Sequence, residues 1–148
     1  MKRFVMNREE IKQILPHREP MLLVDETVQN EDGTVTGKYT VRGDEFFLQG
    51  HFPGNPIVPG VILCEMAAQS SCMLMADAVK GKATLYAGMN NVKFKNPVRP
   101  GDTVEFRCEH IRSVGPIHFV RAEGKVDGKT AVKGEFSFAL VDPEKAKA

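Results

Sequence analysis

The sequence has little that would mark a nucleic-acid-binding, secreted or membrane-spanning protein. Its 148 residues include 20 basic and 19 acidic side chains, a formal net charge of +1, so the basic excess typical of nucleic-acid binders is absent. No run approaches the about 20 apolar residues of a membrane-spanning helix. The charged N-terminus lacks the apolar stretch of a signal peptide. We therefore expect a cytoplasmic protein that binds neither nucleic acid nor membrane.

Cysteines are few and have no metal-binding spacing. Cys64, Cys72 and Cys108 are odd in number and contain no C-x-x-C pair, which indicates neither a disulfide framework nor a zinc site. Cys64 adjoins Glu65 but is turned about 100° around a helix, which argues against a cysteine nucleophile. We expect no metal and no cofactor. Without repeats, low-complexity tracts or linkers, residues 1–148 form one predicted domain.

The pattern of apolar residues and turns predicts an α+β domain. Asn7 and Glu10 form a capping box for a short helix, and Asp32-Gly33 is a hairpin signal between β-like segments around 22–28 and 34–41. A long, mostly apolar helix is expected over about 61–79. Further strands are expected in the following segments: 83–95, 103–112, 117–125 and 130–141. About six antiparallel strands would then form a curled sheet wrapped around one long helix.

His51 lies in a loop that is rich in glycine and proline, Gly50–Gly60. Such residues hold a loop in one conformation, and histidine is the side chain best suited to exchange a proton near neutral pH. A histidine that only hydrogen-bonds within its loop is the alternative. The rigid surroundings favour a functional histidine.

Glu65 is the one carboxylate between Val61 and Ala76, within the predicted apolar helix. A solvated helix face would carry several charges, so Glu65 is expected to lie in an apolar wall, where a carboxyl group is suited to proton transfer. A structural salt bridge is the alternative.

The start of the helix offers backbone donors close to these two side chains. The first N–H groups of a helix have no intrahelical acceptor, and those of Gly60 and Val61 could bind a developing oxyanion. Gln69 lies on the same helix face as Glu65. A base, an acid and an oxyanion donor at one place are what proton abstraction next to a carbonyl requires.

These residues belong to a long motif that resembles the FabZ-type (3R)-hydroxyacyl-[acyl carrier protein] dehydratases of bacterial fatty-acid synthesis. The resemblance extends from about residue 11 to residue 140 and depends on these segments: Leu15–Arg18 (LPHR), Leu22–Asp25 (LLVD), Gly50–Val61 (GHFPGNPIVPGV), Glu65, Ala67–Gln69 (AAQ), Ala87–Met89 (AGM) and Pro97–Asp102 (PVRPGD).

The resemblance implies a hot-dog fold and the conversion of a 3-hydroxyacyl thioester, carried by acyl carrier protein, into the trans-2-enoyl thioester. His51 would remove the C2 proton, and Glu65 would protonate the leaving hydroxyl or orient it. The oxyanion would be held at Gly60, with Phe52 or Val61 as further donors, and Gln69 is assigned to substrate binding. The family also implies a homodimer in which His51 of one subunit faces Glu65 of the other. Three such dimers would form a hexamer.

The chain departs from the family pattern at Glu19 and Met21, near the expected entrance, so Met21 is predicted to affect substrate gating. Tyr86 is near an aromatic residue that gates the tunnel in relatives. A possible docking surface for the carrier protein consists of these basic residues: Lys93, Lys95 and Arg99. A solvated strand face explains the same basic pattern. We interpret the remaining histidines as structural or surface residues: His17, His110 and His118.

Three alternative functions remain open at this point. The first is a dehydratase that also moves the new double bond to C3. Glutamate at position 65 argues against the bifunctional family, which carries aspartate there. The second is a hot-dog thioesterase, and the third is a non-catalytic module that binds acyl chains.

Overall fold

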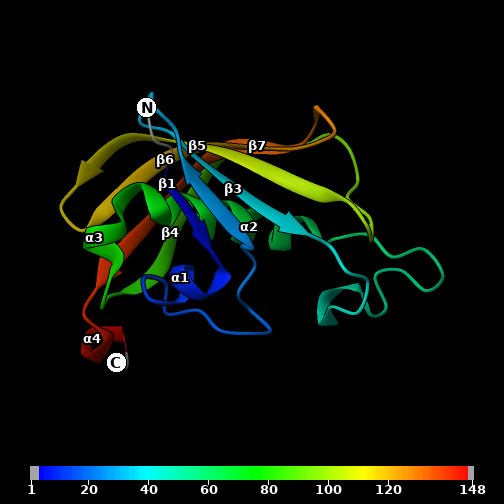
Figure 1. The fold of residues 1–148 in the computed structure, drawn as a ribbon, viewed down its shortest axis with the longest axis horizontal. Coiled ribbons are helices and arrows are strands. Elements are labelled where there is room, and N and C mark those ends of the chain that lie inside the picture. The colour runs from blue at the N-terminus through cyan, green and yellow to red at the C-terminus, as the bar shows by residue number, and fades with distance from the viewer. Residues whose placement is uncertain (1–3, 147–148) are drawn as a thin grey trace.

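A curled antiparallel sheet wraps one side of a central helix (Figure 1) in the computed structural model, which describes residues 4–146. Seven described strands form this sheet in the order β1-β2-β3-β5-β6-β7-β4. The elements run along the chain as follows: β1 Phe4–Asn7, α1 Arg8–Lys12, β2 Glu26–Gln29, β3 Val35–Thr40, η1 Phe46–Leu48, α2 Gly60–Cys72, η2 Met73–Met75, α3 Ala76–Val79, β4 Ala83–Phe94, β5 Thr103–Val114, β6 Ile117–Val126, β7 Lys129–Val141 and α4 Pro143–Ala146. This is the predicted hot-dog architecture.

The N-terminal elements differ from the prediction in two places. β1 was not predicted, and it pairs with β2 just before Asn7 caps α1 in the expected capping box. Leu22, Leu23 and Val24 were expected in a strand; they are buried but lie outside β2, which begins at Glu26. The N–H of Leu23 donates to the side chain of Gln69 at 2.7 Å, so a side chain satisfies a group that would otherwise need a neighbouring strand.

The long helix ends close to the predicted residue but is not continuous. Gly60–Cys72 is α-helical, and a short 3₁₀ turn separates it from α3. Met75, at φ −126° and ψ 46°, lies outside the helical region and breaks the helix there.

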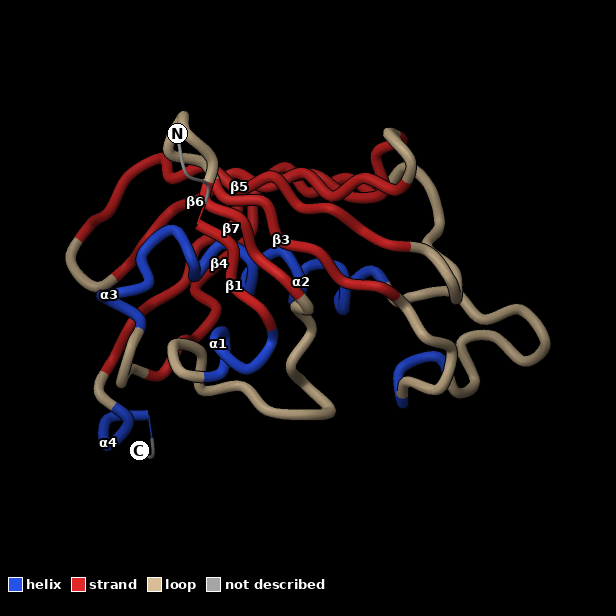
Figure 2. The backbone as a smooth tube through the Cα atoms, in the orientation of Figure 1, coloured by secondary structure: helices blue, strands red, loops and turns tan. Residues whose placement is uncertain are grey.

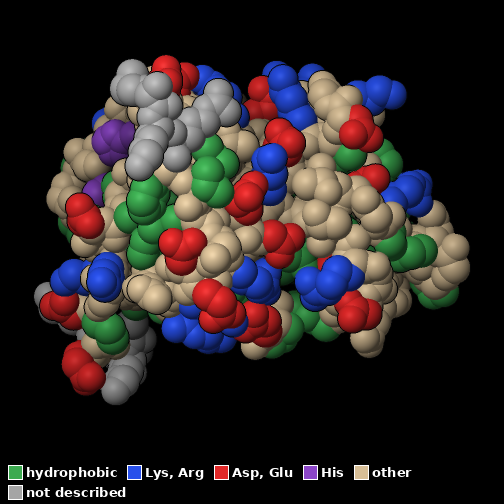
Figure 3. All heavy atoms as spheres, viewed as in Figure 1, with side chains coloured by type: hydrophobic (Ala, Val, Ile, Leu, Met, Phe, Trp, Pro, Cys, Tyr) green, Lys and Arg blue, Asp and Glu red, His purple; other side chains and the backbone are tan. Residues whose placement is uncertain are grey.

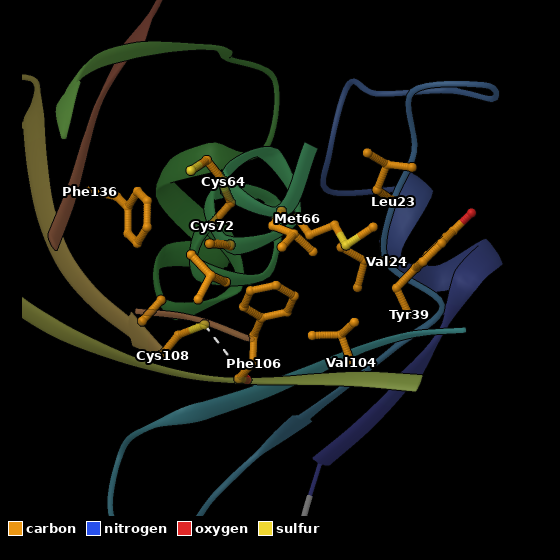
Figure 4. Packing of buried hydrophobic residues seen from close by; sticks show 14 of the residues in the cluster. Leu23, Val24, Tyr39, Cys64, Met66, Cys72, Val104, Phe106, Cys108 and Phe136 are labelled. Atoms are coloured by element: carbon orange, nitrogen blue, oxygen red, sulfur yellow. Dashed lines mark hydrogen bonds between the residues drawn. The ribbon is translucent and has the colours of Figure 1, made fainter. Parts of the chain in front are cut away.

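The core lies between α2 and the concave face of the sheet. In Figure 4, Phe106 on β5 and Phe136 on β7 point toward the helix, and Met66 of α2 belongs to the same buried core cluster. Burial raises the pKa of the Cys64 thiol to about 11 and that of Cys108 to about 12. Both thiols are therefore protonated at neutral pH, which argues against a cysteine nucleophile.

Within residues 4–146, the stretch Gly60–Val79 is long and apolar enough to cross a membrane by length and composition alone. From the sequence, we had expected no stretch of this length and apolar character. Of its most apolar window, 56% is buried inside the fold, so its apolar character is explained by its place as the core helix. On the face in Figure 3, basic and acidic side chains are interspersed, in keeping with the net charge of +1.

Candidate active site

His51 is held by the backbone of its own loop. This loop extends beyond the end of the sheet, between β3 and α2 (Figure 2). The N–H of His51 donates to the carbonyl of Leu48 at 3.1 Å, and its carbonyl accepts from the N–H of Ile57 at 2.8 Å. Its Nδ1 lies 2.9 Å from the carbonyl oxygen of Ile57. Because a carbonyl only accepts, Nδ1 carries the proton, and Nε2 of the neutral ring is left as the base.

Glu45 anchors the segment that leads to His51. Its carboxylate accepts hydrogen bonds from the Tyr39 hydroxyl at 2.7 Å and from the N–H groups of Arg42 and Gly43 at 2.9 and 2.8 Å. Burial alone would raise the pKa of Glu45, but these donors together hold it below its ordinary value. The charged form therefore fixes the turn from which η1 and His51 follow.

His51 and Gly60 line one pocket of about 400 Å³, together with Phe94 and Lys95. α2 begins at Gly60, and the carbonyl of Pro59 accepts from the N–H groups of Ile62 and Leu63. The preceding N–H groups have no intrahelical acceptor.

Glycine at position 60 allows close packing, since a Cβ there would lie 3.0 Å from the Phe94 ring and the ring would have to shift. The N–H of Phe52 already donates to the carbonyl of Asn55 at 3.0 Å. Gly60 is therefore better placed than Phe52 to bind a substrate oxygen.

Glu65 is held by side chains and not by backbone. The amide nitrogen of Gln69 donates to Glu65 Oε2 at 2.7 Å and to the carbonyl of Met21 at 2.7 Å, while its oxygen accepts from the N–H of Leu23. Gln69 was predicted to bind substrate, and that role stays a prediction. In the structure, its amide connects Glu65 to residues 21–23.

His17 contacts Glu65, although the sequence had indicated a structural or surface histidine. Its Nε2 lies 3.4 Å from Glu65 Oε2. Both side chains line a small pocket of about 60 Å³ with Gln69, Tyr86 and Phe138. The sequence signal was its place in the Leu15–Arg18 motif, which we had used only for the family resemblance.

His51 and Glu65 of the same chain line different pockets. Within one chain, the predicted base and oxyanion donor therefore share a pocket, but the predicted acid does not share it with them. His51 and Gly60 form one half-site, which we call the loop half-site. Glu65, Gln69 and His17 form the other, which we call the helix half-site.

Tyr86 and Met21, the predicted gating residues, both adjoin the helix half-site. The Tyr86 hydroxyl donates to the carbonyl of Cys64, and burial raises its pKa. Met21 has 38% of its surface exposed. Glu19, where the chain departs from the family pattern, forms ion pairs with Arg8 and Lys12 at 3.0 Å each.

The three predicted docking residues do not face one pocket. Lys95 lines the pocket of His51, whereas Lys93 lines a separate groove with Arg121 and Lys133. Arg99 donates to the Asn55 side chain at 2.5 Å. Among residues 4–146, no group of three or more His, Cys, Asp and Glu side chains could hold a metal ion.

Comparison with known proteins shows which family the chain is similar to. A family model described as ApeI dehydratase (ApeI-like) matches residues 27–135. The 3-hydroxyacyl-[acyl-carrier-protein] dehydratase FabZ of Lactococcus lactis subsp. cremoris is 45% identical over 137 residues, which cover 91% of this chain and 95% of the relative. FabZ of Clostridium beijerinckii is 43% identical over 141 residues, covering 92% and 99%.

Solved structures agree on the fold. The dehydratase heterocomplex ApeI:P of Xenorhabdus doucetiae matches with a TM-score of 0.79 at 18% identity, covering 93% of this chain and 94% of that one. The fluoroacetyl-CoA thioesterase FlK matches with a TM-score of 0.66 at 16% identity, covering 77% and 89%. At these identities the likeness shows the fold alone, and the sequence relatives carry the assignment: the chain belongs to the FabZ family of 3-hydroxyacyl-[acyl-carrier-protein] dehydratases.

Proposed function

We propose that this protein removes water from a (3R)-3-hydroxyacyl thioester carried by acyl carrier protein and releases the trans-2-enoyl thioester in fatty-acid synthesis. One observation carries the residue assignment. The chain holds His51 as a base beside the N-terminus of α2, and it holds the carboxyl group of Glu65 in a second pocket.

The loop half-site supplies the first part of the reaction. The N–H of Gly60 binds the thioester carbonyl oxygen, with Val61 as a second candidate donor, and stabilises negative charge there. Nε2 of His51 then takes the C2 proton. This nitrogen is free to do so because Nδ1 is committed to the carbonyl of Ile57.

The helix half-site supplies the second part. Glu65 gives a proton to the C3 hydroxyl, the C3–O bond breaks, and water leaves as the C2–C3 double bond forms. Restoring the starting enzyme requires the proton on His51 to return to Glu65 or to pass to solvent. Tyr86 and Met21, beside Glu65, are the side chains that we assign to gating of the acyl chain.

We further propose that the working site joins the loop half-site of one chain to the helix half-site of a second copy. β4 is an edge strand, bonded only to β7 among the described strands. Tyr86 and Met89 pair with buried β7 residues, so they lie on the helix side of the sheet. Met89 is nevertheless half exposed, and Tyr86 remains 36% exposed although its hydroxyl is bound to Cys64. Val61 and Phe94 nearby are also exposed, at 72% and 54%. An edge strand with exposed apolar side chains favours pairing with another chain.

The carrier protein would approach the loop half-site, where Lys95 offers a positive charge at the rim of the His51 pocket. Arg99 and Lys93 remain candidates for a wider docking surface. Assembly of three dimers into a hexamer, and a cytoplasmic location, belong to the same proposal. The mass in solution tests the hexamer.

The reaction is tested by incubating the protein with 3-hydroxyacyl-carrier substrate and identifying the products by mass and by double-bond position. We expect the trans-2-enoyl product and water. A product with the double bond at C3 would reveal isomerase activity. Free thiol would indicate a thioesterase, and an unchanged substrate a binding module; either of these would refute the proposal.

The shared site is tested by mixing two single variants, His51→Ala and Glu65→Gln. Each is expected to lose about 10²–10⁴-fold in turnover. After random exchange of subunits, half of the dimers carry one of each variant, and each of these has one intact site. About one quarter of the wild-type activity should therefore return. No recovery in dimers shown to be mixed would place both groups in one chain.

A further inference from the structure

His17 faces Glu65 in the helix half-site. Its Nε2 is 3.4 Å from Glu65 Oε2, and the two side chains are only 18% and 22% exposed. His17 also lines the same small pocket as Glu65 and Gln69. The contact is therefore inside the pocket that the acyl substrate must enter for Glu65 to reach its hydroxyl group.

The surroundings of the imidazole determine which nitrogen carries its proton. Nδ1 of His17 is buried and has no hydrogen-bond partner among the described residues. A proton on Nδ1 would be buried without an acceptor, which is costly. A proton on Nε2 points at Oε2 of the Glu65 carboxyl group, which can accept it. The neutral ring with Nε2–H is the form that fits this site.

Both contacts to Glu65 fall on the same oxygen. Gln69 donates to Oε2 at 2.7 Å, and His17 Nε2 faces Oε2 as well. Gln69 is itself fixed by Leu23 and Met21, so it cannot turn away to donate elsewhere. Oε1 is the oxygen that this arrangement leaves for the substrate.

We propose that His17 is a positioning residue for Glu65, and that together with Gln69 it reserves Oε1 for the proton transfer. This inference rests on the proposed role of Glu65. When the C3 hydroxyl receives the proton from Oε1, negative charge develops on the carboxylate, and the two donors at Oε2 stabilise it. The 3.4 Å contact shortens when substrate closes the pocket, as catalytic hydrogen bonds often do. His17 thus accelerates the chemical step and does not bind the substrate.

Three substitutions test this role. Glutamine at position 17 places an amide N–H about as far from the backbone as Nε2 of histidine, whereas asparagine reaches only as far as Nδ1. We expect His17→Leu and His17→Asn to lower kcat about tenfold with little change in KM. His17→Gln should restore most of kcat. The two amides are equally polar, so a purely structural role would not separate them.

His110→Leu is the matched control, because His110 is an exposed histidine outside both half-sites. It should leave kcat and KM unchanged, and thermal unfolding of every variant reports on the fold. Should His17→Leu fail to fold, the comparison of glutamine with asparagine still decides the question.

Equal kcat values in the glutamine and asparagine variants would overturn the role of His17, and so would a loss that appears only in KM. The proposed function fails separately, through a wild-type protein that yields no enoyl product or a Glu65→Gln variant with full turnover.

Discussion

The loop half-site and the helix half-site fix their reactive groups by different means. His51 is positioned by backbone hydrogen bonds within ten residues of the chain, the farthest being to Ile57. Glu65 is positioned by the side chain of Gln69, which in turn binds Leu23, 46 residues before Gln69 in the chain. A backbone-held group depends on loop conformation, whereas a side-chain-held group depends on the whole fold. The two halves should therefore respond differently to substitution.

The largest effect should come from separating the two halves. Met89, half exposed on edge strand β4, is changed to Arg to prevent a second copy from pairing there. Each half-site would then keep its own geometry but would no longer face the other half-site on a second copy. We expect monomers by sedimentation and a fall in turnover of about 10²-fold or more, since acid and base no longer act together.

The control for Met89→Arg is Val114→Arg, which places the same charge on another exposed apolar residue, at the β5–β6 turn. It should leave assembly and turnover unchanged. A fully active monomeric Met89→Arg protein would show that one chain suffices.

A smaller loss is expected when the side-chain network of the helix half-site is removed. Gln69→Leu leaves the buried N–H of Leu23 and the carbonyl of Met21 without partners and releases Glu65. An unpaired buried polar group costs about 1–3 kcal/mol, so we expect stability to fall by about this amount in urea unfolding. We expect kcat to fall about tenfold.

Gln29→Leu, an exposed residue of β2, serves as the control for Gln69→Leu. If Gln69→Leu unfolded at the wild-type urea concentration with unchanged kcat, the network would not position Glu65. The loop half-site should keep its geometry in both variants, because its hydrogen bonds are local.

The different construction also explains what the sequence could predict. The sequence pointed to His51 because glycine and proline determine loop geometry locally, and the structure holds it in a loop by local hydrogen bonds. It pointed to Glu65 because a lone carboxylate in an apolar helix is unusual, and Glu65 lies in α2. It also predicted the helix, the hairpin at residues 32–33 and the four C-terminal strands. It could not show the contact of His17 with Glu65, since that contact joins separate segments through packing. β1 was missed because it is four residues long and ends at the residue that caps α1.

The smallest effect on turnover should come from Glu45, which supports the loop half-site from a distance. Glu45→Gln removes the charge that accepts from Tyr39, Arg42 and Gly43, at a cost of about 1–3 kcal/mol at pH 7. The folded pKa of Glu45 is held below its ordinary 4.5, so its ionised form stabilises the fold above that pH. The stabilisation is lost as the pH falls through the folded pKa. Urea unfolding at several pH values should therefore show a difference between wild type and Glu45→Gln that is full at pH 7 and shrinks under acid conditions. Asp44→Asn changes the exposed neighbouring carboxylate and should differ little from wild type in stability at pH 7 or under acid conditions.

A loss of stability in Glu45→Gln that stays constant down to acid pH would mean that charge on Glu45 does not hold the loop. Turnover should fall only about two- to threefold, because the backbone bonds around His51 remain.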